Sequence, residues 1–300
     1  MATIAFVEKS QGEYWDRLNA GIFHISHQRG DEARIYAPVT VNPTAQLQYI
    51  YQALNDGADA LVIVASDSDM FAEAVESALD RGVPVLTMDL DGYTEQRLFH
   101  FGTLPYYQLG RLAAEDMLVR IRKEGPVIAQ SGSDAPGACG KLQGFCDRMK
   151  QAGRDIILIE PDYENPSLAL DRVQSVLENN KNAAGLYGVY AYHCNIQARA
   201  VELCGLEPGS LPIIGFDMLD ETINRLKDGS VAASIWIAEY DFGASAAMAA
   251  GLFACHPWEE VVKFLGGTME DRKQNVRTLP ISCFTKNNVQ TYEKWLESHR

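Results

Sequence analysis

Residues 57–91, GADALVIVASDSDMFAEAVESALDRGVPVLTMDLD, contain an apolar strand, a helix and a second apolar strand that ends in a carboxylate. The two apolar runs are short and continuous, which is typical of strands buried on both faces of a parallel sheet. Helical spacing fills the segment between them, with Ser66 and Asp67 as candidate caps and Gly82 as the stop. This order predicts a βαβ unit of an α/β fold.

The pattern occurs again in residues 182–220, NAAGLYGVYAYHCNIQARAVELCGLEPGSLPIIGFDMLD. Both stretches carry Ala-x-Ala-Val-Glu in the helix and end a Pro-led strand in an aspartate, Asp89 or Asp217. Generic βαβ patterning is the alternative explanation, but the likeness runs through both stretches to the same charged end. We therefore expect two doubly wound lobes rather than one (β/α)₈ barrel. Ligands of open α/β sheets bind beyond the carboxyl ends of the strands, so Asp89, Asp91 and Asp217 are candidate site residues.

The bulk composition is that of an ordinary globular protein. The 300 residues are 47% hydrophobic and 22% charged, with a net charge of −14 and a pI of about 4.9. This charge argues against general binding of nucleic acid. No stretch approaches the roughly 20 apolar residues that cross a bilayer. The start, MATIAFVEKS, leads directly into a strand without the features of a signal peptide, so we expect either a cytoplasmic protein or one whose export signal is absent from this chain.

The cysteines form no C-x-x-C pair. A disulfide set, a metal site and separate buried thiols are the three readings, and we expect separate thiols because a chain of this length does not depend on cross-links. The six residues are Cys139, Cys146, Cys194, Cys204, Cys255 and Cys283.

At this point a resemblance to a known family becomes clear. It is carried by EYWDRLNAG (13–21), GADALVIVASDSD (57–69), GVPVLTMD (82–89), HFGTLPYYQLGRLAAE (100–115), KLQGFCDRM (141–149), IIGFDMLDETINRLKDGSVAASI (213–235) and ISCFTKNNVQTY (281–292). In this order they resemble the periplasmic sugar-binding proteins of the ribose-binding type, with the type I solute-binding fold. The resemblance implies two Rossmann-like lobes with parallel sheets, joined by a three-crossover hinge. It places the lobes at 1–104 plus 238–267 and 105–237 plus 268–300.

The resemblance also implies binding residues. Tyr14 and Trp15 stand where the family stacks aromatic rings on the apolar face of a sugar, although burial in the lobe core is the alternative. Asp89 matches the family's acceptor for ligand hydroxyls, and Phe216 and Asp217 match its Phe-Asp pair. A helix N-cap is the alternative role for the two aspartates.

Other positions depart from the family pattern. Lys141 replaces an arginine, which keeps the cation but loses the bidentate fork; a solvated helix lysine is the alternative. Tyr190 and Tyr192 stand where the family has Asn-Asp, and Ile237 replaces a glutamine, with Glu239 nearby. Because carboxylates and aromatic rings suit a partly cationic ligand, a modified sugar, polyol, aromatic or amine-bearing solute is as well supported as a plain monosaccharide.

We expect no enzymatic activity, no cofactor and no metal. APGACGKL (135–142) lacks the first glycine and the Ser or Thr of a phosphate-binding loop, and G-x-G-x-x-G and G-x-S-x-G are absent from the expected places. His24 and His27 lack an obvious third ligand. His193 beside Cys194 fits a capping or cleft-lining role better than a catalytic dyad.

Three roles remain for a two-lobed binding protein. We favour an extracytoplasmic receptor that closes on a small sugar or sugar-like ligand and delivers it to an ABC transporter. The alternatives are the ligand-sensing domain of a membrane receptor or histidine kinase, and the effector domain of a lactose-repressor-like regulator. We expect a monomer that binds a small molecule and a membrane permease or receptor, but no nucleic acid. Its expected location is periplasmic, or extracellular and anchored to the membrane.

Overall fold

In the computed structural model, which describes residues 1–92 and 95–299, the chain forms two compact units. The first consists of Met1–Thr103, Ala238–Pro280 and His299; the second consists of Leu104–Ile237 and Ile281–Ser298. The third passage between the units lies at 280/281, so the expected boundary at 267/268 was wrong. The reason is that β11 (Val276–Thr278) pairs with β5 (Phe99–Gly102) and so belongs to the first unit.

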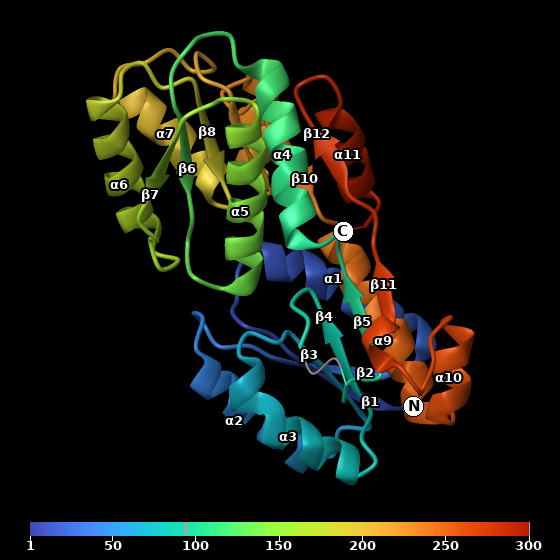
Figure 1. Ribbon diagram of the computed structural model, residues 1–300. Helices are drawn as coiled ribbons and strands as arrows, with labels where there is room; N and C mark the ends of the chain where they lie inside the picture. The colour runs from blue at the N-terminus through green and yellow to red at the C-terminus, as the bar shows by residue number, and fades with distance from the viewer. Residues whose placement is uncertain (93–94, 300) are drawn as a thin grey trace. The chain divides into compact units, whose positions relative to one another are not determined.

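The first unit is built on a sheet with the strand order β11-β5-β4-β3-β1-β2, in which every pair is parallel. Its other strands are β1 (Thr3–Val7), β2 (Glu32–Tyr36), β3 (Ala60–Ile63) and β4 (Val85–Met88). Its helices are α1 (Glu13–Arg29), α2 (Pro43–Asn55), α3 (Ser68–Asp80), α9 (Glu239–Cys255), α10 (Trp258–Phe264) and the 3₁₀ turn η1 (Arg272–Gln274). Helices α2 and α3 cover one face of the sheet, and α1 and α9 pack together on the other (Figure 1).

The second unit has the strand order β12-β10-β9-β8-β6-β7, parallel except for the pair of β10 and β12. Its strands are β6 (Val127–Gln130), β7 (Ile156–Ile159), β8 (Gly185–Gly188), β9 (Ile213–Phe216), β10 (Ala233–Trp236) and β12 (Ser282–Phe284). Its helices are α4 (Tyr106–Arg120), α5 (Pro136–Gln151), α6 (Pro166–Asn179), α7 (His193–Leu203), α8 (Asp220–Asp228) and α11 (Val289–Glu297). Helices α4 and α5 pair on one face, and α6 and α7 pair on the other (Figure 1).

The two sheets repeat one topology. Strands β2, β1, β3, β4 and β5 of the first unit occupy the same places in the order as β7, β6, β8, β9 and β10 of the second. Only the last strand differs, because β11 is parallel to its neighbour and β12 is antiparallel. The predicted fold class, two doubly wound α/β lobes related by an internal repeat, is therefore confirmed.

Helix ends fall where the sequence places stop and start signals. Gly30 adopts a left-handed φ of 71° at the end of α1, a conformation that glycine takes without a steric penalty. The Asn42 side chain accepts a hydrogen bond from Ala45 N at 3.0 Å, and Asp67 accepts one from Met70 N at 3.0 Å. These caps satisfy amide groups that the first turns of α2 and α3 leave unpaired.

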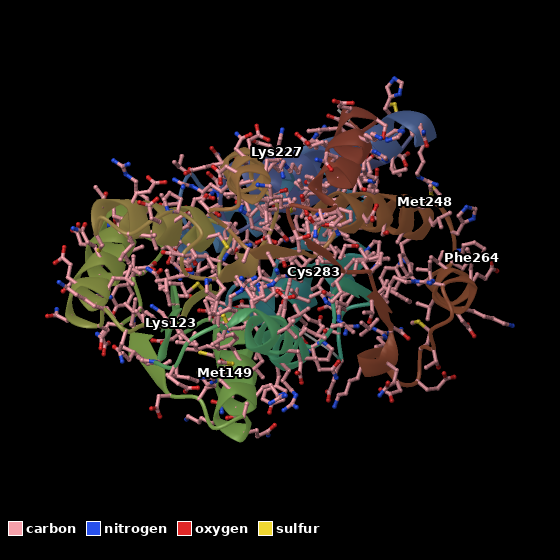
Figure 2. The ribbon with its side chains drawn as sticks, turned by 90° about the horizontal axis from the view of Figure 1, so that it is seen from above. Lys123, Met149, Lys227, Met248, Phe264 and Cys283 are labelled. Atoms are coloured by element: carbon pink, nitrogen blue, oxygen red, sulfur yellow. The ribbon has the colours of Figure 1, made fainter. Side chains whose placement is uncertain are left out.

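All six cysteines are free, as expected, but only Cys146 and Cys194 are buried. Cys139, Cys255 and Cys283 are exposed, and Figure 2 labels Cys283, which belongs to the edge strand β12. The expectation of six buried thiols was therefore wrong for these three and for Cys204, which is half-buried. Within residues 1–92 and 95–299, none of the helices has the length and apolar content needed to span a bilayer.

Candidate ligand-binding site

The two strand-end aspartates share an unusual backbone geometry. Asp89 follows β4 with a φ of 58°, and Asp217 follows β9 with a φ of 68°. The Asp89 N–H donates to the carbonyl of Phe101 on β5 at 3.0 Å, and the Asp217 N–H donates to that of Ile235 on β10 at 2.9 Å. A left-handed φ is uncommon for a residue with a side chain and occurs often at functional sites. The repeat thus extends to the conformation of its charged ends.

Neither aspartate caps a helix. The helix after Asp217 is α8, whose N-cap residue is Leu219. None of the described helices begins directly after Asp89. The capping alternative was therefore wrong for both residues, and a ligand-binding role for them stays a prediction.

The structure gives Asp91 a supporting role. Arg97, which is fully buried, donates from Nε to Asp91 Oδ1 at 2.6 Å and from Nη2 to Oδ2 at 2.8 Å. Its Nη1 donates to the carbonyls of Arg272 and Asn275 at 2.9 and 3.0 Å, which ties the end of β4 to the segment before β11. Both carboxylate oxygens of Asp91 therefore already accept hydrogen bonds from Arg97.

Electrostatics at this cluster agree with a structural ion pair. Burial raises the pKa of Asp91, but the Arg97 hydrogen bonds and the nearby His100 outweigh it and hold that pKa below its ordinary value. His100 has its pKa lowered to about 4, chiefly by burial. It is thus neutral near pH 7, and its Nδ1 lies 2.9 Å from the hydroxyl of Thr87.

The aromatic pair at the start of α1 divides into a buried and a half-buried residue. Trp15 is only 5% exposed, and its indole N–H donates to Ser10 Oγ at 2.9 Å. Tyr14 is half-buried, with its ring 5.0 Å from that of Trp15 in an edge-on arrangement. Burial in the first unit, the alternative for Trp15, is what the structure shows. Tyr14 retains surface for stacking.

Glu239 lies in the first turn of α9 and is 1% exposed. Its Oε1 is 3.9 Å from Nη1 of Arg17, whose Nη2 contacts Glu13 at 2.5 Å. A carboxylate in the first turn also interacts favourably with the helix dipole. The structure thus places Glu239 in a buried charged cluster between α9 and α1.

Glu8 was not singled out from the sequence. It is the residue directly after β1 and is 1% exposed. Burial raises its pKa to about 8, although a hydrogen bond from Asn19 at 3.4 Å opposes the shift. The signal that identified Asp89, a carboxylate at the tip of an apolar strand, was present here in TIAFVE (3–8).

In the second unit, Lys141 is buried rather than solvated. It is 8% exposed, donates to the carbonyl of Val189 at 3.2 Å, and lies 4.1 Å from the centre of the Phe216 ring. The solvated-helix alternative was therefore wrong. Phe216 is fully buried and offers its face to the ammonium group, a cation–π contact. In this structure, the Phe216 ring therefore packs against the Lys141 ammonium group and stabilises it.

Tyr190 and Tyr192 form a stacked pair after β8. Their ring centres are 6.0 Å apart and the planes differ by 18°. The Tyr190 hydroxyl pairs with Ser133 Oγ at 2.7 Å, and the Tyr192 hydroxyl donates to Asp162 Oδ1 at 2.6 Å. Tyr190 packs so closely on Gly132 that a Cβ there would lie 2.1 Å from the ring. The pair is therefore held by both the loop after β6 and the loop after β7.

Asp162 and His193 form a hydrogen-bonded pair that contacts both tyrosines. Both are fully buried, and His193 Nε2 lies 2.9 Å from Asp162 Oδ2. His193 Nδ1 accepts hydrogen bonds from the amides of Val189 and Tyr190 at 3.1 and 3.2 Å, so Nε2 carries the proton and donates it to Asp162. Burial lowers the pKa of His193 against the opposing effect of Asp162.

His193 therefore holds the loop between β8 and α7. It does not cap α7, whose N-cap residue is Tyr192, so of the two roles that the sequence favoured over a Cys/His dyad, capping was wrong and the cleft-lining role stays a prediction. Asp162 was missed, although it follows the apolar strand in DIILIEPD (155–162). Within the described part of the chain, no three His, Cys, Asp or Glu side chains gather where they could hold a metal ion.

The fold and the strand-end residues define a periplasmic binding protein of type I. The model of the periplasmic binding protein domain family matches residues 4–255, which is most of the chain. The chain belongs to this family and is of its ribose-binding type.

Individual relatives agree with this assignment. The chain is similar to the ribose import binding protein RbsB of Bacillus subtilis (strain 168), with 23% identity over 221 residues, 73% of this chain and 70% of the relative. It is similar in structure to the glucose-galactose binding protein GanP of Geobacillus stearothermophilus, with a TM-score of 0.82, 22% identity and coverage of 96% and 98%. It is also similar in structure to a solute-binding protein of an ABC transporter from Burkholderia graminis C4D1M, in complex with D-arabinose. That comparison has a TM-score of 0.84 and 20% identity, and it covers 97% of each chain. At these identities the structural likeness establishes the fold.

Proposed function

We propose that this protein is an extracytoplasmic receptor that binds a small sugar or sugar-like solute and delivers it to an ABC transporter in the membrane. The observation that carries the proposal is the pair of matching strand ends, where Asp89 and Asp217 leave β4 and β9 in the same left-handed conformation. Ligands of doubly wound sheets bind beyond such strand ends. The names of the relatives, which are import and solute-binding proteins, support the same role.

In the proposed mechanism, ligand binding stabilises a closed form in which both units contact the solute. The passages of the chain between the units at 103/104, 237/238 and 280/281 would supply the hinge that such a motion requires. The ligand shifts the population only as far as it binds the closed form more tightly. The closed form is then recognised by the membrane partner. No step in this role requires the protein to act as an enzyme.

The test is a thermal-shift screen of the purified protein against sugars, polyols, amines, nucleosides and aromatic metabolites, followed by calorimetry on the hits. A ligand at a hundredfold excess over its Kd stabilises the folded protein by about 2.7 kcal/mol. We expect a sugar or sugar-like compound among the hits, and a fall in the radius of gyration when it binds. Binding of none of these solutes would refute the proposal.

A further inference from the structure

The residue that the proposed function leaves unexplained is Glu8. It stands where the chain leaves β1, and β1 lies between β2 and β3 in the sheet. The strand order reverses its direction at this strand, and such a switch point is where open α/β sheets bind their ligands. Glu8 therefore occupies the place in the first unit where a ligand group is expected.

Its side chain belongs to the face of the sheet that α1 and α9 cover. Ala5 and Val7 pack into the core beneath α2 and α3. Because side chains alternate along a strand, Glu8 lies on the opposite face. The hydrogen bond of 3.4 Å from Asn19 Nδ2 on α1 to Glu8 Oε2 agrees with this placement.

Two buried oxygen atoms, one on each of these side chains, lack a hydrogen-bond partner among the described residues. Within residues 1–92 and 95–299, neither Glu8 Oε1 nor Asn19 Oδ1 has a hydrogen-bond partner, and both atoms are shielded from solvent. A buried polar atom without a partner costs free energy, so such atoms in a native protein call for an explanation. A ligand that supplies donors at this point would satisfy both.

The charges around Glu8 favour a cationic donor. Asp16 on α1 adds negative charge that acts on Glu8, and Glu239 lies at the start of α9, the helix that packs against α1. The guanidinium of Arg17 contacts Glu13 and Glu239, so its ion pairs are made with other carboxylates. An ammonium group carries three N–H donors and no acceptor, whereas a hydroxyl carries a single donor. The ammonium is therefore the better complement to two acceptors in an acidic setting.

We propose that Glu8 and Asn19 form a subsite for a protonated amine, so that the solute is an amine-bearing sugar or polyol. This inference rests on the proposed function and narrows its substrate class. In the free protein the burial that raises the pKa of Glu8 to about 8 keeps the carboxyl protonated near pH 7. When an ammonium group binds, the Glu8 carboxyl releases that proton to the solvent, and the resulting carboxylate forms an ion pair with the ammonium.

The experiment measures affinities for matched pairs of compounds that differ in one amine: glucosamine and glucose, galactosamine and galactose, and glucamine and sorbitol. Wild type is compared with Glu8→Gln, which keeps the side-chain shape, and with Glu73→Gln, which removes one charge from an exposed position on α3 in the same unit. Circular dichroism and the melting temperature establish that each variant folds.

In wild type and in Glu73→Gln, we expect one amine to bind at least about tenfold more tightly than its neutral partner. In Glu8→Gln that preference falls to about twofold or less. Below pH 8, affinity for glucamine increases by up to about tenfold for each unit by which the pH is raised, because its amine stays protonated while Glu8 must lose a proton to pair with it. Asp16 is the charged group that acts on Glu8, while Arg17 and Glu239 pair with each other on the neighbouring helices α1 and α9. The pH effect must vanish in Glu8→Gln.

Three outcomes overturn the inference. If only the neutral members bind, or bind as tightly as the amines, the amine subsite is refuted while the receptor function stands. If the preference for an amine survives in Glu8→Gln, Glu8 is not its source. Binding of no member of any pair refutes the inference, and the wider screen then decides the proposed function separately.

Discussion

Glu8→Gln gives a prediction about stability that needs no ligand. The Glu8 carboxyl has a pKa of about 8 in the folded protein, against an ordinary value of 4.5. Between these values the folded state holds a proton that the unfolded chain has lost. The free energy of unfolding of the wild type therefore falls as the pH rises through this window. Glutamine does not titrate, so the variant lacks this contribution.

The size of the effect follows from the width of the window. Each unit of pKa difference corresponds to about 1.4 kcal/mol. Between about pH 5.5 and about pH 7.5, the free energy of unfolding of the wild type should fall by about 2 to 3 kcal/mol relative to that of Glu8→Gln. Above about pH 8.5 both states of the wild type are ionised, and the difference between the two proteins levels off.

The assay is urea unfolding of both proteins at several pH values across this range, with Glu73→Gln as the control. Other titrating groups are common to the proteins, so they cancel in the difference. The free energy of unfolding of Glu73→Gln should differ from that of wild type by the same amount at every pH. A difference between wild type and Glu8→Gln that does not change with pH would show that Glu8 is ionised in the folded protein, and the reasoning about its burial would be refuted.

Two further substitutions test the supporting clusters. Asp91→Ala leaves the buried guanidinium of Arg97 without its counterion and should lower the free energy of unfolding by about 3 to 5 kcal/mol, measured by urea unfolding; a stable variant would show that the ion pair is dispensable. Asp162→Ala removes the acceptor of both Tyr192 and His193 and should cost about 2 to 4 kcal/mol. Unchanged stability and unchanged near-ultraviolet circular dichroism would contradict its role in holding the tyrosine pair.

The architecture could be predicted because it depends on local patterns. Short apolar strands, capped helices and the repeat of residues 57–91 in 182–220 determine the two doubly wound sheets. The boundary at 280/281 could not be predicted in the same way, because β11 is only three residues long and belongs to the first unit through its pairing with β5. Such pairing is a long-range contact without a local signal.

The candidate site was predicted less completely, and for a physical reason. Asp89 and Asp91 look alike in the sequence, but Arg97 binds both oxygens of Asp91 from six residues away. Phe216 and Lys141 both looked like ligand contacts, whereas one supports the other. Side-chain partners are set by tertiary packing, so the strand-end rule finds positions but does not say which of them the protein uses for its own stability.

The most direct test of the central claim is calorimetry on Asp89→Asn and Asp217→Asn with the tightest ligand from the screen. Asparagine tolerates the left-handed conformation of both positions, so melting temperatures of the free proteins should change little. If the repeated strand ends form the solute site, each substitution weakens binding at least about tenfold, or about 1.4 kcal/mol. Wild-type affinity in both variants would contradict the account.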